Sequence, residues 1–244
     1  MVYTLPVCVA MMRAGFSCMD IAIVHYQTPE LTGALLRSIR KTTPGARITV
    51  FENSVDPRRL LPPSEDVTVI DNTCGQIVDF DALLARHPRR STEHAQDASV
   101  KHMASVDALW DFLPDGFILL DSDVLLRRDI SDLADPSVAW CGQLQYGMTF
   151  GSGRFRPRAL PFVCWINVPM CRAAGIRYFD ETRSWKLEPG MFYDTGASFY
   201  LDVRKADLPE RQIRWEDYAV HFKGGSWDGR DPAQFLRENQ ALYV

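Results

Sequence analysis

The first half of the chain alternates short apolar runs with segments of helical periodicity, and this alternation limits the folds that it can adopt. A Thr-Pro-Glu sequence at 28–30 has the residue types that begin a helix, and apolar residues at 31, 35 and 39 repeat at helical spacing. A longer helix is predicted over about residues 91–112. Four apolar runs have the length of buried strands: residues 21–26, 48–51, 67–70 and 117–120. We therefore predict an α/β fold with a mixed, mainly parallel sheet flanked by helices.

No linker separates two domains, so one domain is predicted over residues 19–244, with halves at 19–125 and 126–244. Residues 1–18 are mildly apolar but carry Arg13 in the middle, which is atypical of a signal peptide. We expect them to form a disordered, dispensable extension. A segment with arginines at 154, 156 and 158 is predicted to be a solvated loop.

Charge and cysteine spacing exclude several classes of partner. The net charge of −4 argues against a nucleic-acid surface, and no apolar run approaches the roughly 20 residues of a membrane span. The six cysteines form no CxxC pair, which argues against a zinc site and favours free thiols in a reducing compartment. We expect a cytoplasmic protein that has at most peripheral contact with the inner face of a membrane.

The strand predicted at 117–120 delivers two carboxylates, Asp121 and Asp123, at its carboxyl end. Ligands bind at this edge in open α/β sheets. Two adjacent carboxylates stay ionised most easily around a cation, and hard oxygen ligands suit Mg²⁺ or Mn²⁺. The alternative is that Asp121 caps a turn and Asp123 is solvated.

The segment FILLDSDVLLRRDISDL resembles the DxD segment of GT-A glycosyltransferases, particularly those of family 8. The opening IAIVHYQTPELTGALLRSIRKTTPGARITVFENS is similar to the first strand, helix and strand of family 2 enzymes. The resemblance implies a GT-A fold and transfer of a sugar from a nucleotide-sugar. Family 8 enzymes retain the anomeric configuration and family 2 enzymes mostly invert it, so the stereochemistry stays open.

A second motif, VHFKGGSW at 220–227, resembles the late His-Gly segment of family 8 enzymes. The resemblance implies that His221 is the third metal ligand and that the following loop covers the diphosphate. The Lys-Pro of that family is absent, so Lys223 offers its charge from a different place. A structural histidine at the end of a strand is the alternative. The implied loop residues are Gly224, Gly225 and Ser226 for the nucleotide-sugar and Trp227 for the acceptor.

Further nucleotide-sugar contacts are expected at the carboxyl ends of the strands and on the helix before the DxD segment. The alternatives are a helix cap for Thr28, a solvated loop for Glu52 and Asn53, and a solvated helix face for His94 and Lys101. The expected contacts are His25, Tyr26, Thr28, Glu52, Asn53, Asp71, His94, Lys101 and Ser122.

Asp194 resembles the acceptor-side carboxylate that acts as general base in inverting GT-A enzymes. A helix N-cap is the alternative, and in a retaining enzyme Asp194 would position the acceptor. Trp165 and Tyr193 are expected to contact the acceptor.

Together these features predict a metal-dependent glycosyltransferase that uses Mn²⁺ or Mg²⁺ and a nucleotide-sugar, most simply UDP-linked. Its acceptor would be a hydroxyl of a glycan or a lipid-linked glycan, in bacterial-type surface polysaccharide synthesis. The alternatives are a nucleotidyltransferase and a non-catalytic nucleotide- or glycan-binding module. A nucleotidyltransferase would need a glycine-rich loop after the first strand, which Gln27-Thr28-Pro29 does not provide.

Overall fold

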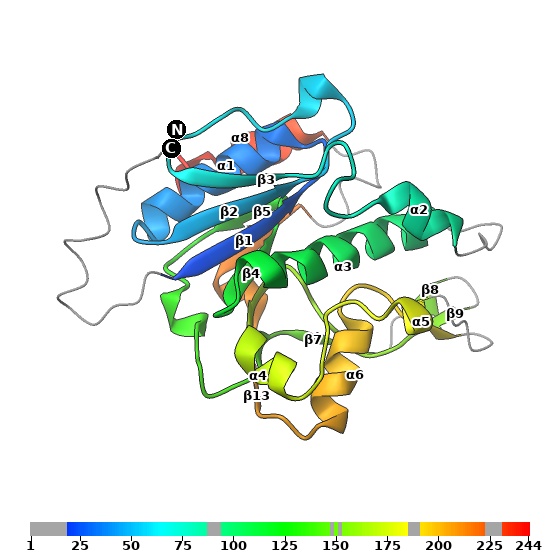
Figure 1. Cartoon of the computed structure of the whole chain (residues 1–244). Helices are drawn as coiled ribbons and strands as arrows, with labels where there is room; N and C mark the ends of the chain where they lie inside the picture. The colour runs from blue at the N-terminus through cyan, green and yellow to red at the C-terminus, as the bar shows by residue number, and fades with distance from the viewer. Residues whose placement is uncertain (1–18, 87–93, 147–148, 151–152, 185–190, 223–230) are drawn as a thin grey trace, which may run out of the picture.

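The computed structural model describes residues 19–86, 94–146, 149–150, 153–184, 191–222 and 231–244. A seven-stranded sheet forms its centre, with strand order β13-β6-β11-β4-β1-β2-β3 (Figure 1). The strands of this sheet are β1 (Asp20–His25), β2 (Arg47–Glu52), β3 (Val67–Asp71), β4 (Phe117–Asp121), β6 (Trp140–Gly142), β11 (Val163–Ile166) and β13 (Glu210–Gln212).

The four strands β4, β1, β2 and β3 run parallel, and β13 is parallel to β6. Only β11 among the seven runs antiparallel to its two neighbours, β4 and β6. The chain passes from β1 outward to β2 and β3, and then returns to place β4 on the other side of β1. Such a reversal of strand order opens a crevice at the carboxyl ends of β1 and β4.

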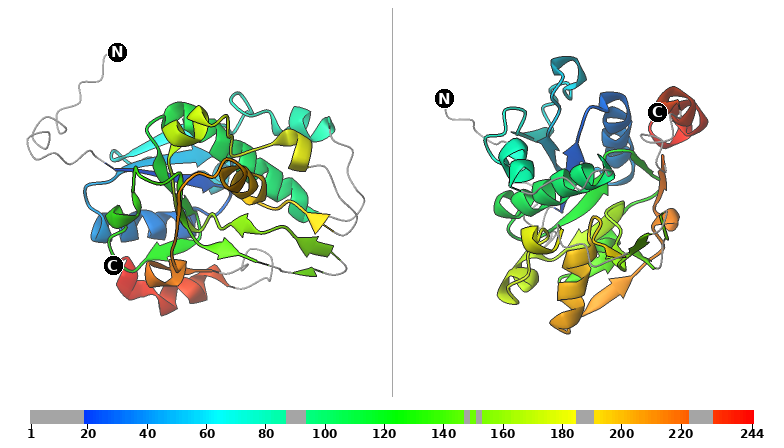
Figure 2. Two further views of the ribbon diagram at one scale, coloured as in Figure 1. Left: turned by 90° about the horizontal axis from the view of Figure 1, so that it is seen from below. Right: turned by 90° about the vertical axis from the view of Figure 1, so that its right-hand side faces the viewer.

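Alternating side chains of the sheet supply two separate cores. Ile21 and Ile23 of β1 face one core, where they pack with α1 (Pro29–Thr42). Ala22 and Val24 face the other core, which contains α3 (His94–Phe112). In Figures 1 and 2, α1 and α8 (Pro232–Glu238) lie side by side on one face of the sheet and α3 crosses the opposite face. Helices therefore cover both faces, which explains why β1 and β4 carry apolar side chains on both faces.

The remaining elements are short. β5 pairs with β14 in an antiparallel ribbon, and β10 pairs with β7. The other strands are β5 (Val124–Leu126), β7 (Leu144–Gln145), β8 (Thr149–Phe150), β9 (Gly153–Phe155), β10 (Arg158–Ala159), β12 (Met191–Phe192) and β14 (Ala219–His221). The other helices are α2 (Phe80–Ala85), α4 (Val168–Ala173), α5 (Glu181–Ser184) and α6 (Ala197–Lys205), with 3₁₀ turns η2 (Pro57–Arg59), η3 (Ser131–Leu133), η4 (Trp215–Asp217) and η5 (Gln240–Leu242).

The predicted α/β fold with a mainly parallel sheet and flanking helices is confirmed. Strands from both predicted halves belong to the one seven-stranded sheet, whereas the domain boundary at residue 19 stays a prediction because residues 1–18 lie outside the described residues. The four cysteines in the described part are free thiols: Cys74, Cys141, Cys164 and Cys171. No described helix combines the length and apolar character needed to span a lipid bilayer.

Candidate metal centre and its surroundings

The pairing of two short strands brings the distant His221 to the DxD segment. β4 ends at Asp121, a turn follows, and the chain continues as β5 from Val124. β14 runs antiparallel to β5, with His221 directly opposite Val124. The backbone N–H of Phe222 also donates to the carbonyl of Asp123 at 3.1 Å. Register alone therefore places the imidazole beside the two carboxylates.

Asp121, Asp123 and His221 each present one ligand atom, and these atoms all lie within 4.8 Å of one another. Nε2 of His221 is 3.0 Å from Oδ1 of Asp123 and 3.9 Å from Oδ2 of Asp121. Two carboxylates and an imidazole are a donor set suited to Mn²⁺ or Mg²⁺. The residues present therefore fit the predicted divalent cation.

Aromatic rings fix the orientation of His221. Phe162 stacks on the imidazole, with ring centroids 4.0 Å apart, and Trp215 meets it edge-on at 5.9 Å. The histidine side chain is only 7% exposed. Its ring plane is thus set by packing before any ligand binds.

A second histidine, His102 of α3, contacts the same aspartate. Its Nε2 lies 3.3 Å from Oδ1 of Asp121. Burial disfavours the charged carboxylate, yet the neighbouring His102 and His221, together with Arg158, hold the pKa of Asp121 below its ordinary value. Asp121 therefore stays ionised inside the protein, as a cation ligand must.

Thr28 and Ser122 meet at the switch point between β1 and β4. Their hydroxyl oxygens are 3.5 Å apart. Thr28 is the N-cap residue of α1, as its alternative role predicts, but its side chain makes no capping hydrogen bond. The structure therefore places two of the predicted nucleotide-sugar contacts together beside the carboxylates.

His25 and Glu52, two further predicted contacts, are buried and hydrogen-bonded within the protein. His25 is fully buried, with Nδ1 2.7 Å from Thr32 Oγ1 and Nε2 3.1 Å from the carbonyl of Arg59. Glu52 accepts hydrogen bonds from the backbone N–H groups of Ser54 and Leu61. Both side chains therefore hold the loop after β2 in place, and a ligand would reach them only if that loop moved.

Asn53 also bonds within the protein, because it donates to Ser105 of α3 and accepts from Asn72. Tyr26, in contrast, is half exposed directly after β1. Asp71 is exposed at the end of the outermost strand β3, where hydrogen bonds from Thr73 lower its pKa. The expected nucleotide-sugar contacts therefore divide into buried structural groups and exposed groups along the carboxyl edge.

On α3, Nζ of Lys101 lies 5.7 Å from the ring centroid of Phe80. The contact of Lys101 with a nucleotide-sugar stays a prediction. A row of polar residues three apart on the same helix faces the candidate metal centre and its neighbours. Ser99 donates to Asp194 at 2.6 Å, His102 contacts Asp121, and Ser105 accepts from Asn53 at 2.8 Å. The spacing of three among apolar neighbours is a signal by which this row could have been found in the sequence.

Asp194 is surrounded by hydrogen-bond donors. Oδ1 accepts from Ser99 Oγ and from the backbone N–H of Thr195 at 2.7 Å. Oδ2 forms an ion pair with Arg158, whose Nε also donates to Gln145 at 2.7 Å. Arg158 was expected in a solvated loop, but it lies in β10 and its side chain is only 17% exposed. Pairing of β10 with β7 places it there.

The glycine after Thr195 makes this arrangement possible. Gly196 has a φ of +79°, and a Cβ at this position would lie 2.1 Å from the carbonyl oxygen of Ala159. Only glycine tolerates both the backbone conformation and the close approach. The turn therefore brings Asp194 against Arg158, the neighbour of Ala159 in β10.

Trp165 does not reach the carboxyl edge, which corrects its expected contact with the acceptor. It pairs with Ile118 near the start of β4, is 8% exposed, and its ring lies where a Cβ on Gly116 would be. Tyr193 is partly exposed next to Asp194, with the guanidinium of Arg156 5.6 Å from its ring centroid. The side chain of His94 and the loop residues Lys223, Gly224, Gly225, Ser226 and Trp227 lie outside the described residues.

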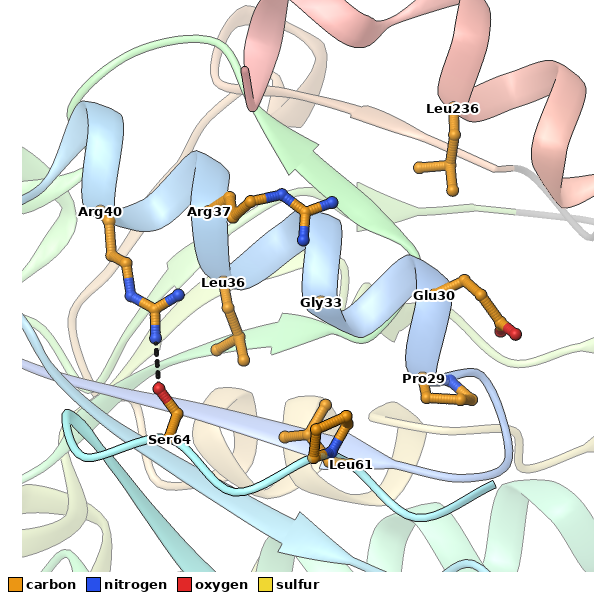
Figure 3. A pocket seen from close by; sticks show the side chains of 10 residues that line it. Pro29, Glu30, Gly33, Leu36, Arg37, Arg40, Leu61, Ser64 and Leu236 are labelled. Atoms are coloured by element: carbon orange, nitrogen blue, oxygen red, sulfur yellow. Dashed lines mark hydrogen bonds between the residues drawn. The ribbon is translucent and has the colours of Figure 1, made fainter. Parts of the chain in front are cut away.

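A groove of about 400 Å³ lies elsewhere, along α1 (Figure 3). Arg37 and Arg40 of α1 border it, Leu236 of α8 lies on the far side, and Arg40 donates to Ser64. None of its lining residues belongs to the cluster of Asp121, Asp123 and His221. The groove and the candidate metal centre are therefore separate features.

No protein-family model matches the chain, and no curated protein matches it in sequence. Similar solved structures include the galactosyltransferase LgtC in complex with donor and acceptor sugar analogues. The two chains are 16% identical with a TM-score of 0.48, and the match covers 81% of this chain and 74% of LgtC. The glycosyltransferase GlyE of Streptococcus pneumoniae TIGR4 is 12% identical with a TM-score of 0.45, covering 93% and 51% of the two chains.

The mannosyltransferase PcManGT from Pyrobaculum calidifontis, in complex with GDP-Man and Mn²⁺, is 12% identical with a TM-score of 0.41. That match covers 80% of this chain and 54% of the mannosyltransferase. All three are glycosyltransferases, the class that the motif resemblance predicts. What this chain does is inferred below from its own side chains.

Proposed function

We propose that the chain is a metal-dependent glycosyltransferase. The observation that supports this most directly is the cluster of Asp121, Asp123 and His221 at the carboxyl edge, beside the β1–β4 switch point. A divalent cation held by these residues would neutralise charge on a departing nucleoside diphosphate. The DxD segment and the late histidine both resemble those of GT-A enzymes, and here they meet in one place.

In the proposed reaction, an acceptor hydroxyl oxygen bonds to the anomeric carbon of the donor sugar. The bond from that carbon to the diphosphate oxygen breaks, and the nucleoside diphosphate leaves with the bonding electrons. Thr28 and Ser122 would contact the nucleotide-sugar beside the carboxylates. We further propose a UDP-linked donor, and a glycan or lipid-linked glycan of a surface polysaccharide as acceptor.

Asp194 is the proposed acceptor-side carboxylate. If the reaction inverts the anomeric centre, Asp194 takes the proton of the acceptor hydroxyl. Both of its oxygens already accept hydrogen bonds, so the acceptor hydroxyl would have to share an oxygen with Ser99 or Arg158. If the reaction retains configuration, the proton of the acceptor hydroxyl would pass to the departing diphosphate oxygen, and Asp194 would orient the acceptor.

The test compares binding and product release. We expect UDP to raise the melting temperature with Mn²⁺ or Mg²⁺ but not with excess chelator, and UDP-sugars to release UDP. Asp123→Asn should abolish both responses. Asp132→Asn, which changes an exposed carboxylate paired with Arg128, should leave both unchanged.

The alternatives give different products in the same assay. A nucleotidyltransferase would transfer the nucleotide of a nucleoside triphosphate to a sugar phosphate and would release pyrophosphate. A non-catalytic module would show a thermal shift without any turnover, or a shift with free sugar alone. Full turnover of nucleotide-sugar in excess chelator would overturn the proposed role of the cation.

A further inference from the structure

We propose that His102 is a positioning residue that holds one carboxylate oxygen of Asp121, so that the other oxygen of Asp121 faces His221. This inference rests on the metal site of the proposed function. Nε2 of His102 lies 3.3 Å from Oδ1, while Nε2 of His221 lies 3.9 Å from Oδ2. The aspartate is thus placed between two imidazoles, one at each oxygen, and only His221 belongs to the three-residue cluster.

The surroundings of His102 leave Asp121 as its natural partner. Both ring nitrogens are buried, and neither has a well-aligned hydrogen bond within the described residues. A buried nitrogen without a partner is unfavourable, because it loses the hydrogen bond that it would make with water. The contact of Nε2 with Oδ1, at 3.3 Å, is slightly long for a hydrogen bond. With the proton on Nε2, His102 donates to Asp121.

Hydrogen bonds anchor α3 on both sides of His102. Ser99 bonds to Asp194, and Ser105 bonds to both Asn53 and the carbonyl of Lys101. The adjacent Met103 is fully buried in the core. The imidazole is therefore presented to Asp121 from a fixed backbone, so its hydrogen bond orients the carboxylate rather than following it.

An oriented carboxylate binds a cation better than one that rotates freely. Hydrogen bonds to the outer atoms of metal ligands typically change metal affinity by about 10–100-fold. With Oδ1 engaged by His102, Asp121 would offer Oδ2 as a single ligand atom on the side of Asp123 and His221. His102 thereby acts on the cation through Asp121 and not by direct contact.

The experiment measures Mn²⁺ binding to the nucleotide-free protein by electron paramagnetic resonance of the free ion. His102→Ala should weaken binding by about 10–100-fold. His102→Gln should recover most of the affinity, because its amide nitrogen reaches about as far from the backbone as Nε2. Asp111→Asn, an exposed position on the same helix that pairs with Arg172, should bind like wild type.

The outcomes separate this inference from the proposed function. If wild-type protein takes up no Mn²⁺ at millimolar concentration, the metal site itself is wrong. If wild type and His102→Ala bind equally well, the metal site stands and the positioning role is wrong. A folded His102→Gln variant that binds as weakly as His102→Ala would contradict the hydrogen bond. Circular dichroism and melting temperature establish folding, and the Gln variant carries the test if the Ala variant unfolds.

Discussion

Nε2 of His221 lies 3.0 Å from Oδ1 of Asp123, although the two residues are far apart in the sequence. The antiparallel pairing of β5 with β14 creates this contact. It joins two motifs that are separate in sequence into one donor set for a divalent cation.

His221→Ala should abolish metal-dependent UDP binding, because it removes the one imidazole of the cluster. It also removes a ring stacked on Phe162, so the matched control is Phe162→Leu, which loses the stacked ring but keeps all three ligands. Isothermal titration of UDP with Mn²⁺ should show binding by the Phe162→Leu variant only. If both variants lose UDP binding equally, the loss is caused by altered packing around the ring and not by the missing metal ligand.

Asp194→Asn tests the acceptor-side carboxylate. If Asp194 is the general base, kcat should fall by about 10²–10⁴-fold while UDP affinity stays the same. Arg158→Gln distinguishes a second role, since Asp194 also pairs with Arg158. If the aspartate acts only by holding Arg158, both single variants and the double variant should lose the same activity. Turnover near wild type in Asp194→Asn would rule out the base.

Gly196→Ala should destabilise the protein by at least about 2 kcal/mol, because the new Cβ meets the carbonyl of Ala159 in a backbone conformation that favours glycine. Urea unfolding measures the change. Gly175→Ala is the matched control, since Gly175 has a φ of +70° but no atom within 4 Å of the added Cβ. If both variants lose equal stability, backbone strain alone explains the effect, and the close approach to β10 contributes nothing.

Asp66→Asn should lower stability in a pH-dependent way. Hydrogen bonds from Arg40 and Ser64 hold the pKa of Asp66 at about 2, below the ordinary 3.8. A carboxyl with a lowered folded-state pKa contributes its stability above the unfolded-state pKa and loses it as the pH falls to the folded-state value.

The difference in unfolding free energy between wild type and Asp66→Asn should therefore be complete above about pH 5 and vanish near pH 2. It should be small, because the Asp66 side chain is 53% exposed. Urea titrations across this range measure it. A difference that stays constant with pH would mean that the ion pair with Arg40 does not act through the charge of Asp66.

The elements of the fold follow closely from local sequence. The apolar runs became β1, β2, β3 and β4, and α1 begins at Pro29, as the Thr-Pro-Glu sequence predicts. Burial on both faces needs continuous apolar residues, and a helix start needs particular residue types, so neighbouring residues encode both features. The segment at 214–222 is less regular, because it contains η4 and the short β14. Its short, irregular elements are set by contacts with β5 and Phe162.

Local sequence is enough to identify the groups that can bind a cation: two carboxylates after a buried strand, and a late histidine. Which other side chains meet them depends on how distant segments pack. This packing buried His25 and Glu52 beneath the loop after β2, directed Lys101 to Phe80, and brought His102 and Arg158 inward. The physical reason is that strand register and helix rotation fix where a side chain points, and both are set by packing between segments distant in sequence.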